Sequence, residues 1–211
     1  TLLLVGFMWT GSATIIAQEN ISIDLETNEV NVSAEVESLT TETFNWRTSN
    51  SVSNLKAKID GTERKCEIEK LAVGSLIECP SEKRENFTVQ LSYVTEGMTS
   101  DLEGAKIFRY SQPIYRPIKN YSFEVILPEG TGVLDPEKTT REVISPNTGG
   151  VENKDGRRFV VKWNTNPTLR EPESFSVIYE PLSDTETQII NPKLVLGIIS
   201  TLIIISLIIY R

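Results

Sequence analysis

Residues 29–36 read EVNVSAEV and residues 87–94 read FTVQLSYV, and both stretches alternate apolar with polar side chains. Successive side chains of a β-strand point to opposite faces of the sheet, so a period of two predicts half-buried strands. The apolar face of these two strands would carry Val30, Val32, Ala34, Val36, Phe87, Val89, Leu91 and Tyr93.

Four further runs are rich in β-branched and aromatic residues: FRYSQPI (108–114), NYSFEVIL (120–127), RRFVVKW (157–163) and ESFSVIYE (173–180). Asp60-Gly61 and Asp155-Gly156 are typical of two-residue hairpin turns. Because no useful helical period occurs between residues 18 and 190, we expect an all-β fold of one or two tandem β-sandwich (Ig-like) units.

A faint internal repeat bears on the number of units. Residues 76–94 and 159–180 share a plan of strand, polar turn, and a second strand with Phe, Val and Tyr. If this is a duplication, residues 18–98 and 104–182 form two related sandwich units. The alternative is that any two sandwich hairpins look alike and the chain folds as one unit.

The two ends are apolar. Residues 1–17 contain no charged residue and predict the apolar part of a signal peptide, with Ala17 before the cleavage site. The alternative is an N-terminal membrane anchor. Residues 194–210 are apolar on every face and would span about 25 Å as a helix, which predicts a single transmembrane helix. Residues 183–193 then form a short stalk.

Charge limits the partners. All 29 acidic residues but only 19 of the 21 basic ones lie between residues 18 and 190, a net charge of −10 for this part of the chain. Nucleic-acid binding depends on clustered Lys and Arg, so we expect no nucleic acid to bind here.

Cys66 and Cys79 are the only cysteines, and they flank a strand, a loop that contains Gly74, and a second strand. Outside the reducing cytoplasm such a pair predicts a disulfide worth on the order of 3 kcal/mol. Four Asn-x-Ser/Thr sequons agree with an exported chain and make candidate glycosylation sites at exposed turns or strand edges, namely Asn20, Asn31, Asn86 and Asn120.

Candidate chemistry is sparse because the chain has no histidine. This removes the usual Ser-His and Cys-His nucleophile systems and most zinc sites. Acidic turns at 134–137 and 153–156 do not have the ligand spacing of a calcium loop. We therefore expect no enzyme activity, no catalytic residues, no metal site and no cofactor.

Residues 107–136 (IFRYSQPIYRPIKNYSFEVILPEGTGVLDP), followed by DGRRFVVKW at 155–163 and SFSVIYE at 174–180, resemble the ectodomains of archaeal single-pass membrane proteins. Many members of that family continue into a cytoplasmic winged-helix module, which implies a membrane-bound regulator or sensor. The LPEG strand is also weakly similar to the lumenal β domains of ribophorin I, an oligosaccharyltransferase subunit.

Together these features predict a single-pass cell-membrane protein with its β-sandwich outside, acting in surface recognition, sensing or envelope structure. Its partners would be membrane lipid around the C-terminal helix and one or more proteins in or outside the membrane. The alternative is an accessory subunit of a membrane complex such as a glycosylation or translocation machine.

Overall fold

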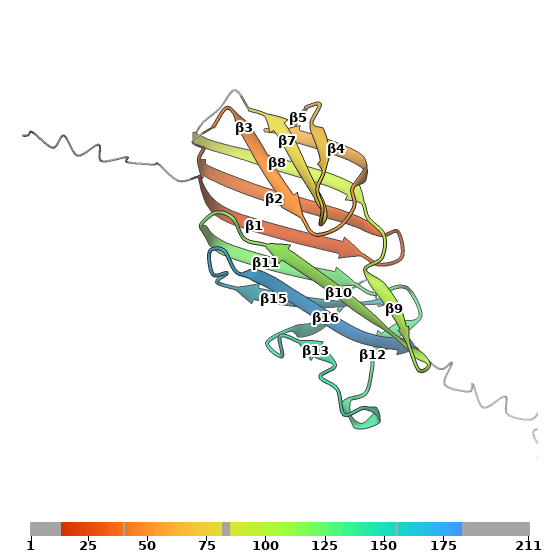
Figure 1. Cartoon of the computed structure of the whole chain (residues 1–211). Coiled ribbons are helices and arrows are strands. Elements are labelled where there is room, and N and C mark those ends of the chain that lie inside the picture. Colours follow the sequence, from red (N-terminus) through yellow and green to blue (C-terminus); the bar gives the residue numbers. More distant parts are fainter. Residues whose placement is uncertain (1–13, 40, 82–84, 155, 183–211) are drawn as a thin grey trace, which may run out of the picture. The chain divides into compact units, whose positions relative to one another are not determined.

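The computed structural model describes residues 14–39, 41–81, 85–154 and 156–182. The chain divides into a compact unit, Thr1–Glu180, and a second unit, Pro181–Arg211. The described part of the first unit is built from strands and one short 3-10 turn, Pro136–Lys138. The expected all-β fold is therefore confirmed, and the sheets form the two layers of a sandwich (Figure 1).

One layer is a mixed eight-stranded sheet. Its neighbours pair antiparallel except at the centre, where β1 and β11 run parallel. In spatial order the strands are β14 (Gly150–Lys154), β15 (Arg158–Thr165), β11 (Ile118–Ile126), β1 (Ile15–Asp24), β2 (Glu29–Ser38), β8 (Glu85–Val94), β4 (Ser53–Ile59) and β5 (Thr62–Glu63).

The other layer consists of two smaller sheets that lie across the first (Figure 1). The three-stranded sheet has the order β3 (Thr43–Thr48), β7 (Ser75–Pro80) and β6 (Glu67–Lys70). The larger one has the order β12 (Thr131–Val133), β16 (Pro172–Pro181), β10 (Ala105–Pro113) and β9 (Thr99–Leu102), with β13 (Ile144–Ser145) also paired to β16.

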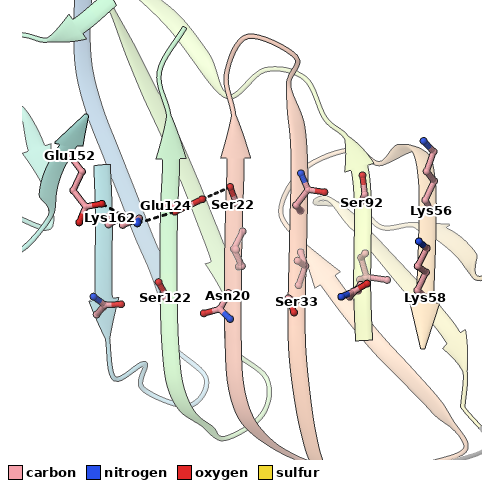
Figure 2. Close-up of a pocket in the computed structure, with 16 residues that line it drawn as sticks. Asn20, Ser22, Ser33, Lys56, Lys58, Ser92, Ser122, Glu124, Glu152 and Lys162 are labelled. Carbon is pink, nitrogen blue, oxygen red and sulfur yellow. Dashed lines mark hydrogen bonds and ion pairs between the residues drawn. The ribbon is translucent and has the colours of Figure 1, made fainter. Parts of the chain in front are cut away.

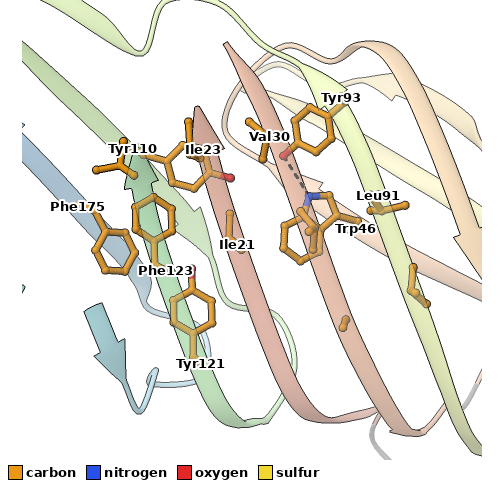
Figure 3. Close-up of a cluster of buried hydrophobic side chains, with 14 of the residues drawn as sticks. Ile21, Ile23, Val30, Trp46, Leu91, Tyr93, Tyr110, Tyr121, Phe123 and Phe175 are labelled. Atoms are coloured by element: carbon orange, nitrogen blue, oxygen red, sulfur yellow. Dashed lines mark hydrogen bonds between the residues drawn. The ribbon is translucent and has the colours of Figure 1, made fainter. Parts of the chain in front are cut away.

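The core lies between the layers, and the alternating strands supply it as expected. Each of the eight apolar residues that the two opening stretches predicted to share a face is buried. Phe123 is central to an aromatic cluster in which its ring stacks on Phe175, with centroids 4.1 Å apart, and on Tyr110 at 5.3 Å (Figure 3). Burial of large aromatic rings is a main source of stability in a sandwich core.

The disulfide between Cys66 and Cys79 is present and ties the start of β6 to β7. The hairpin between these strands contains Gly74 at a φ of +81°, and a Cβ there would overlap the Thr48 carbonyl oxygen. Only glycine fits this close approach of two backbones.

The two hairpin turns differ in length. Asp60 and Gly61 both have positive φ and join β4 to β5 as the expected two-residue turn. In the β14–β15 hairpin Lys154 pairs with Arg158, so three residues separate the strands rather than two. Asp155 itself lies outside the described residues.

The predicted boundary after Ala17 falls inside a paired strand. β1 begins at Ile15, and Ile16 is completely buried and pairs with Val36 on one side and Ile118 on the other. Residues 15–17 therefore belong to the folded sheet. The remainder of the predicted leader, residues 1–13, lies outside the described residues.

The segments 18–98 and 104–182 are joined in one sheet, because β1 from the first pairs with β11 from the second. The two similar hairpins are not placed equivalently. The chain passes from the three-stranded sheet to the eight-stranded one between β7 and β8, but leaves the eight-stranded sheet between β15 and β16. The two similar stretches of sequence, residues 76–94 and 159–180, therefore do not form equivalent structures.

The predicted stalk and transmembrane helix, residues 183–210, lie outside the described residues. Among the residues that are described, no helix is long and apolar enough to cross a membrane.

Candidate functional site

The outer face of the eight-stranded sheet carries an open groove of about 770 Å³. Its floor is made by polar side chains that alternate with core residues along β1, β2, β8, β11 and β15 (Figure 2). The uncharged polar groups on this floor are Asn20, Ser22, Asn31, Ser33, Gln90, Ser92, Ser122 and Asn164.

Charged groups at one side of the groove form a network across four strands. The Lys162 ammonium lies 3.1 Å from the Glu152 carboxylate and 3.7 Å from that of Glu124. The Ser22 hydroxyl donates a 2.7 Å hydrogen bond to the other oxygen of Glu124 (Figure 2). The hydrogen bond to Glu152 and the two nearby carboxylates raise the pKa of Lys162.

The other side of the groove is formed by β4, where Lys56 and Lys58 are exposed (Figure 2). A second hollow of about 410 Å³ adjoins the groove and shares Asn20, Ser122 and Asn164 with it. This hollow adds further amide groups from Gln18, Asn120 and Asn166. The polar floor thus continues along the face of the sheet.

Three of the four predicted glycosylation sites lie inside central strands instead of turns or edges. Asn20, Asn31 and Asn120 belong to β1, β2 and β11, and all three line the groove or its adjoining hollow. In a strand, an Asn and the Ser two residues later face the same way, so the polar face produces the sequon pattern by itself. Asn86 is exposed on β8, near the sheet's end.

A buried carboxyl group lies on the opposite, core-facing side of the same sheet. Glu19 is 1% exposed, and its Oε1 atom has no hydrogen-bond partner among the described residues. Burial raises the pKa of Glu19 from 4.5 to about 7, and the positive charge of Arg116 opposes that rise. A shift of this size marks a group held in an unusual environment.

Arg116 connects this carboxyl group to the second layer. Its Nη2 atom donates to the Asn45 carbonyl, and its guanidinium lies 4.5 Å from the centre of the Phe44 ring. The Gln112 side chain donates to the Arg47 carbonyl at 3.1 Å. Arg116 and Gln112 thus donate hydrogen bonds to carbonyl oxygens of β3 that are not bonded to its partner strand β7.

Four large aromatic residues belong to the core, since Trp46, Tyr93, Trp163 and Tyr179 are all 3% exposed or less. No group of three or more metal-ligating side chains occurs among the described residues.

The groove and Glu19 were not singled out from the sequence. A signal for Glu19 does exist, because it stands in phase with Ile21 and Ile23 on the apolar side of β1. The groove has a weaker signal, since any half-buried strand presents a polar face, and only the assembly of the strands in one sheet brings these side chains together.

No family model matches the chain, and no curated protein matches its sequence. Solved structures with similar chain traces include yeast LTA4 hydrolase, at 12% identity and a TM-score of 0.46, covering 80% of this chain and 29% of the enzyme. An M1 zinc metallopeptidase from Deinococcus radiodurans shows 12% identity and a TM-score of 0.46, and the match covers 81% of this chain and 43% of that chain. Legionella pneumophila aminopeptidase A shows 12% identity and a TM-score of 0.44, and the match covers 80% of this chain and 21% of that enzyme.

The chain therefore spans less than half the length of each of these enzymes. TM-scores below 0.5 do not establish a shared fold, and peptidase or hydrolase activity is a property of those proteins. The resemblance to archaeal membrane proteins stays a prediction.

Proposed function

We propose that this chain is a non-catalytic recognition protein that binds a polyhydroxylated ligand, such as an oligosaccharide chain, along the outer face of its eight-stranded sheet. The observation that carries the proposal is the open 770 Å³ groove with its floor of amide and hydroxyl groups. Serine hydroxyls and carboxamides both donate and accept hydrogen bonds, as sugar hydroxyls do.

The charge of the groove supports an uncharged ligand. The chain as a whole has a net charge of −8, but the groove is lined by three lysines and two glutamates. The carboxylates of Glu124 and Glu152 are held by Lys162. The groove therefore presents little net charge, and its neutral centre is what a neutral polar chain requires.

The apolar run at residues 194–210 motivates the rest of the proposal, in which the protein is anchored in the cell membrane with the sandwich outside. In that location the groove meets surface or envelope polysaccharides. Glycans attached at Asn20 or Asn31 would fill the groove, so the proposal requires that these two sequons stay unmodified in the native protein.

Replacing Ser33 with tryptophan is expected to weaken oligosaccharide binding by about tenfold or more, because the indole fills the centre of the floor. The matched control is Glu35→Trp, two residues along the same face of β2 and outside the groove. The full chain in mild detergent is applied to an immobilised panel of neutral oligosaccharides, and the best binder is then titrated by calorimetry.

Glu35→Trp is expected to bind like the wild type. Failure of the wild type to bind any member of the panel at millimolar concentration would contradict the proposal, as would an equal loss of affinity in both variants.

A further inference from the structure

The outer face of the three-stranded sheet lies on the side of the sandwich opposite the groove, and it is divided by charge. Alternation along the strands turns Phe44, Trp46, Ile77 and Cys79 into the core. The side chains that face outward are Thr43, Asn45 and Arg47 on β3, Leu76 and Glu78 on β7, and Glu67 and Glu69 on β6. We call these seven residues the outer face.

The β3 side of the outer face is basic. Arg47 lies with its guanidinium 4.9 Å from the centre of the Tyr115 ring. Arg47, Arg116 and Arg170 line a separate open hollow of about 540 Å³. No acidic side chain lines this hollow. In a chain of net charge −8 this is an unusual concentration of arginine.

The β6 side of the outer face is acidic. Glu67 and Glu69 are exposed on β6, and Glu78 follows on β7. Neighbouring strands lie about 4.8 Å apart, so the β6 carboxylates are roughly 10 Å from β3. None of the three carboxylates forms an ion pair with Arg47 or Arg170 within the described part of the chain.

Apolar side chains accompany both charged sides. Six large hydrophobic residues are exposed among those described, and three of them flank the outer face. Tyr115 and Leu169 are 53% and 43% exposed on the basic side, and Val73, between β6 and β7, is 70% exposed on the acidic side. Leu76, half-buried, lies between them on the middle strand.

From this arrangement we propose that the outer face is a homodimer interface, occupied by the same face of a second copy of the chain. A two-fold axis that lies between the two faces, runs parallel to β7 and passes near Leu76 brings β3 of one copy over β6 of the other. The arginines of each copy then meet the glutamates of the other, with which they form no ion pair within the described part of one chain, and the two Leu76 side chains meet at the centre. The basic side and the acidic side of this face complement each other, as contact between two copies requires. An unrelated acidic partner would need only the basic side.

Two features of the fold favour contact through this face. The carbonyl oxygens of Asn45 and Arg47 on the free edge of β3 already accept hydrogen bonds from Arg116 and Gln112, so strand addition at that edge is blocked. The Cys66–Cys79 disulfide holds β6, and with it Glu67 and Glu69, in place. The oligosaccharide groove stays open in such a dimer, because it lies on the other layer.

Sedimentation of the full chain in mild detergent tests the interface. The wild type is expected to form a dimer that weakens as salt rises, since surface charge pairs are screened. Arg47→Glu alone and Glu69→Arg alone are each expected to raise the dimer dissociation constant by about tenfold or more, because each places like charges opposite one another twice.

An equimolar mixture of Arg47→Glu and Glu69→Arg is expected to recover a heterodimer, since the reversed charges of one variant match those of the other. The control is Lys154→Glu, an exposed reversal on β14 at the far edge of the other sheet. A monomeric wild type, a dimer indifferent to both reversals, or a mixture that stays monomeric would each overturn the proposal. Measuring oligosaccharide binding by the monomeric variants tests the proposed function separately, because the groove does not depend on the dimer.

Discussion

Substitution of Ile16 by alanine is expected to lower the free energy of unfolding by about 2–5 kcal/mol, the usual cost of truncating a buried isoleucine. Ile16 is completely buried, its amide donates to the Pro117 carbonyl at 3.0 Å, and it pairs with both neighbours of β1. Truncation therefore opens a cavity between the layers at the end of the central strand. Urea unfolding of the purified full chain, followed by tryptophan fluorescence, measures the change.

The matched control is Gln18→Ala, two residues further along and exposed, which is expected to change stability by less than about 0.5 kcal/mol. The pair of variants also tests the N-terminal boundary. If a leader is removed after Ala17, Ile16 is absent from the purified protein and its substitution has no effect. Equal stability of the two variants would thus contradict the assignment of residues 15–17 to the fold.

The second large effect concerns pH. The folded pKa of Glu19 is about 7, against 4.5 for an ordinary glutamate, so the folded state binds the proton more tightly than the unfolded state does. Stability from this group is fully present below pH 4.5 and is lost as pH rises through 7. A shift of this size corresponds to roughly 3 kcal/mol of stability between those two pH values.

The charged and titratable groups near Glu19 do not reverse this direction. Burial lowers the pKa of Arg116 and the charge of Glu19 opposes this, while the positive charge of Arg116 limits the rise in the pKa of Glu19. Burial raises the pKa of Tyr93 and that of Tyr121, so both phenols stay neutral. The Glu19 carboxyl is therefore the group expected to titrate inside this part of the core.

Glu19→Gln removes that titration. We expect the variant to match the wild type near pH 4 and to exceed its stability at pH 8 by up to roughly 3 kcal/mol, because a neutral amide replaces a buried carboxylate. Glu35→Gln, exposed on the outside of β2, is the control. Chemical unfolding at a series of pH values measures the difference, and a difference between Glu19→Gln and wild type that does not vary with pH would refute the mechanism.

The groove and the outer face lie on different layers of the sandwich. Polar alternation gives the eight-stranded sheet a continuous hydrogen-bonding floor, while the three-stranded sheet presents opposite charges across one strand. If both proposals hold, a dimer would present two grooves facing away from each other. Two sites on one particle bind a polymeric ligand more tightly than either site alone.

Local patterns in the sequence determined much of this protein. Strict alternation in EVNVSAEV and FTVQLSYV was sufficient to predict β2 and β8 and the side chains they bury, because the period of two acts within a single strand. Asp60-Gly61 was likewise sufficient to predict its turn, because the positive φ values that the turn requires depend on these two residues alone. The two cysteines, with no competing partner in the chain, could pair in only one way.

Only the tertiary structure decided the features that join distant residues. The parallel pairing of β1 with β11 brings together residues about 100 positions apart, and no local pattern encodes it. That pairing merges the two predicted units in one sheet and brings polar side chains from both of them into one groove. Glu19 and Arg116 likewise become neighbours only when the layers close. The candidate groove and the buried Glu19 site depend on such long-range contacts, because the chemistry of single residues is ordinary until the sheets bring them together.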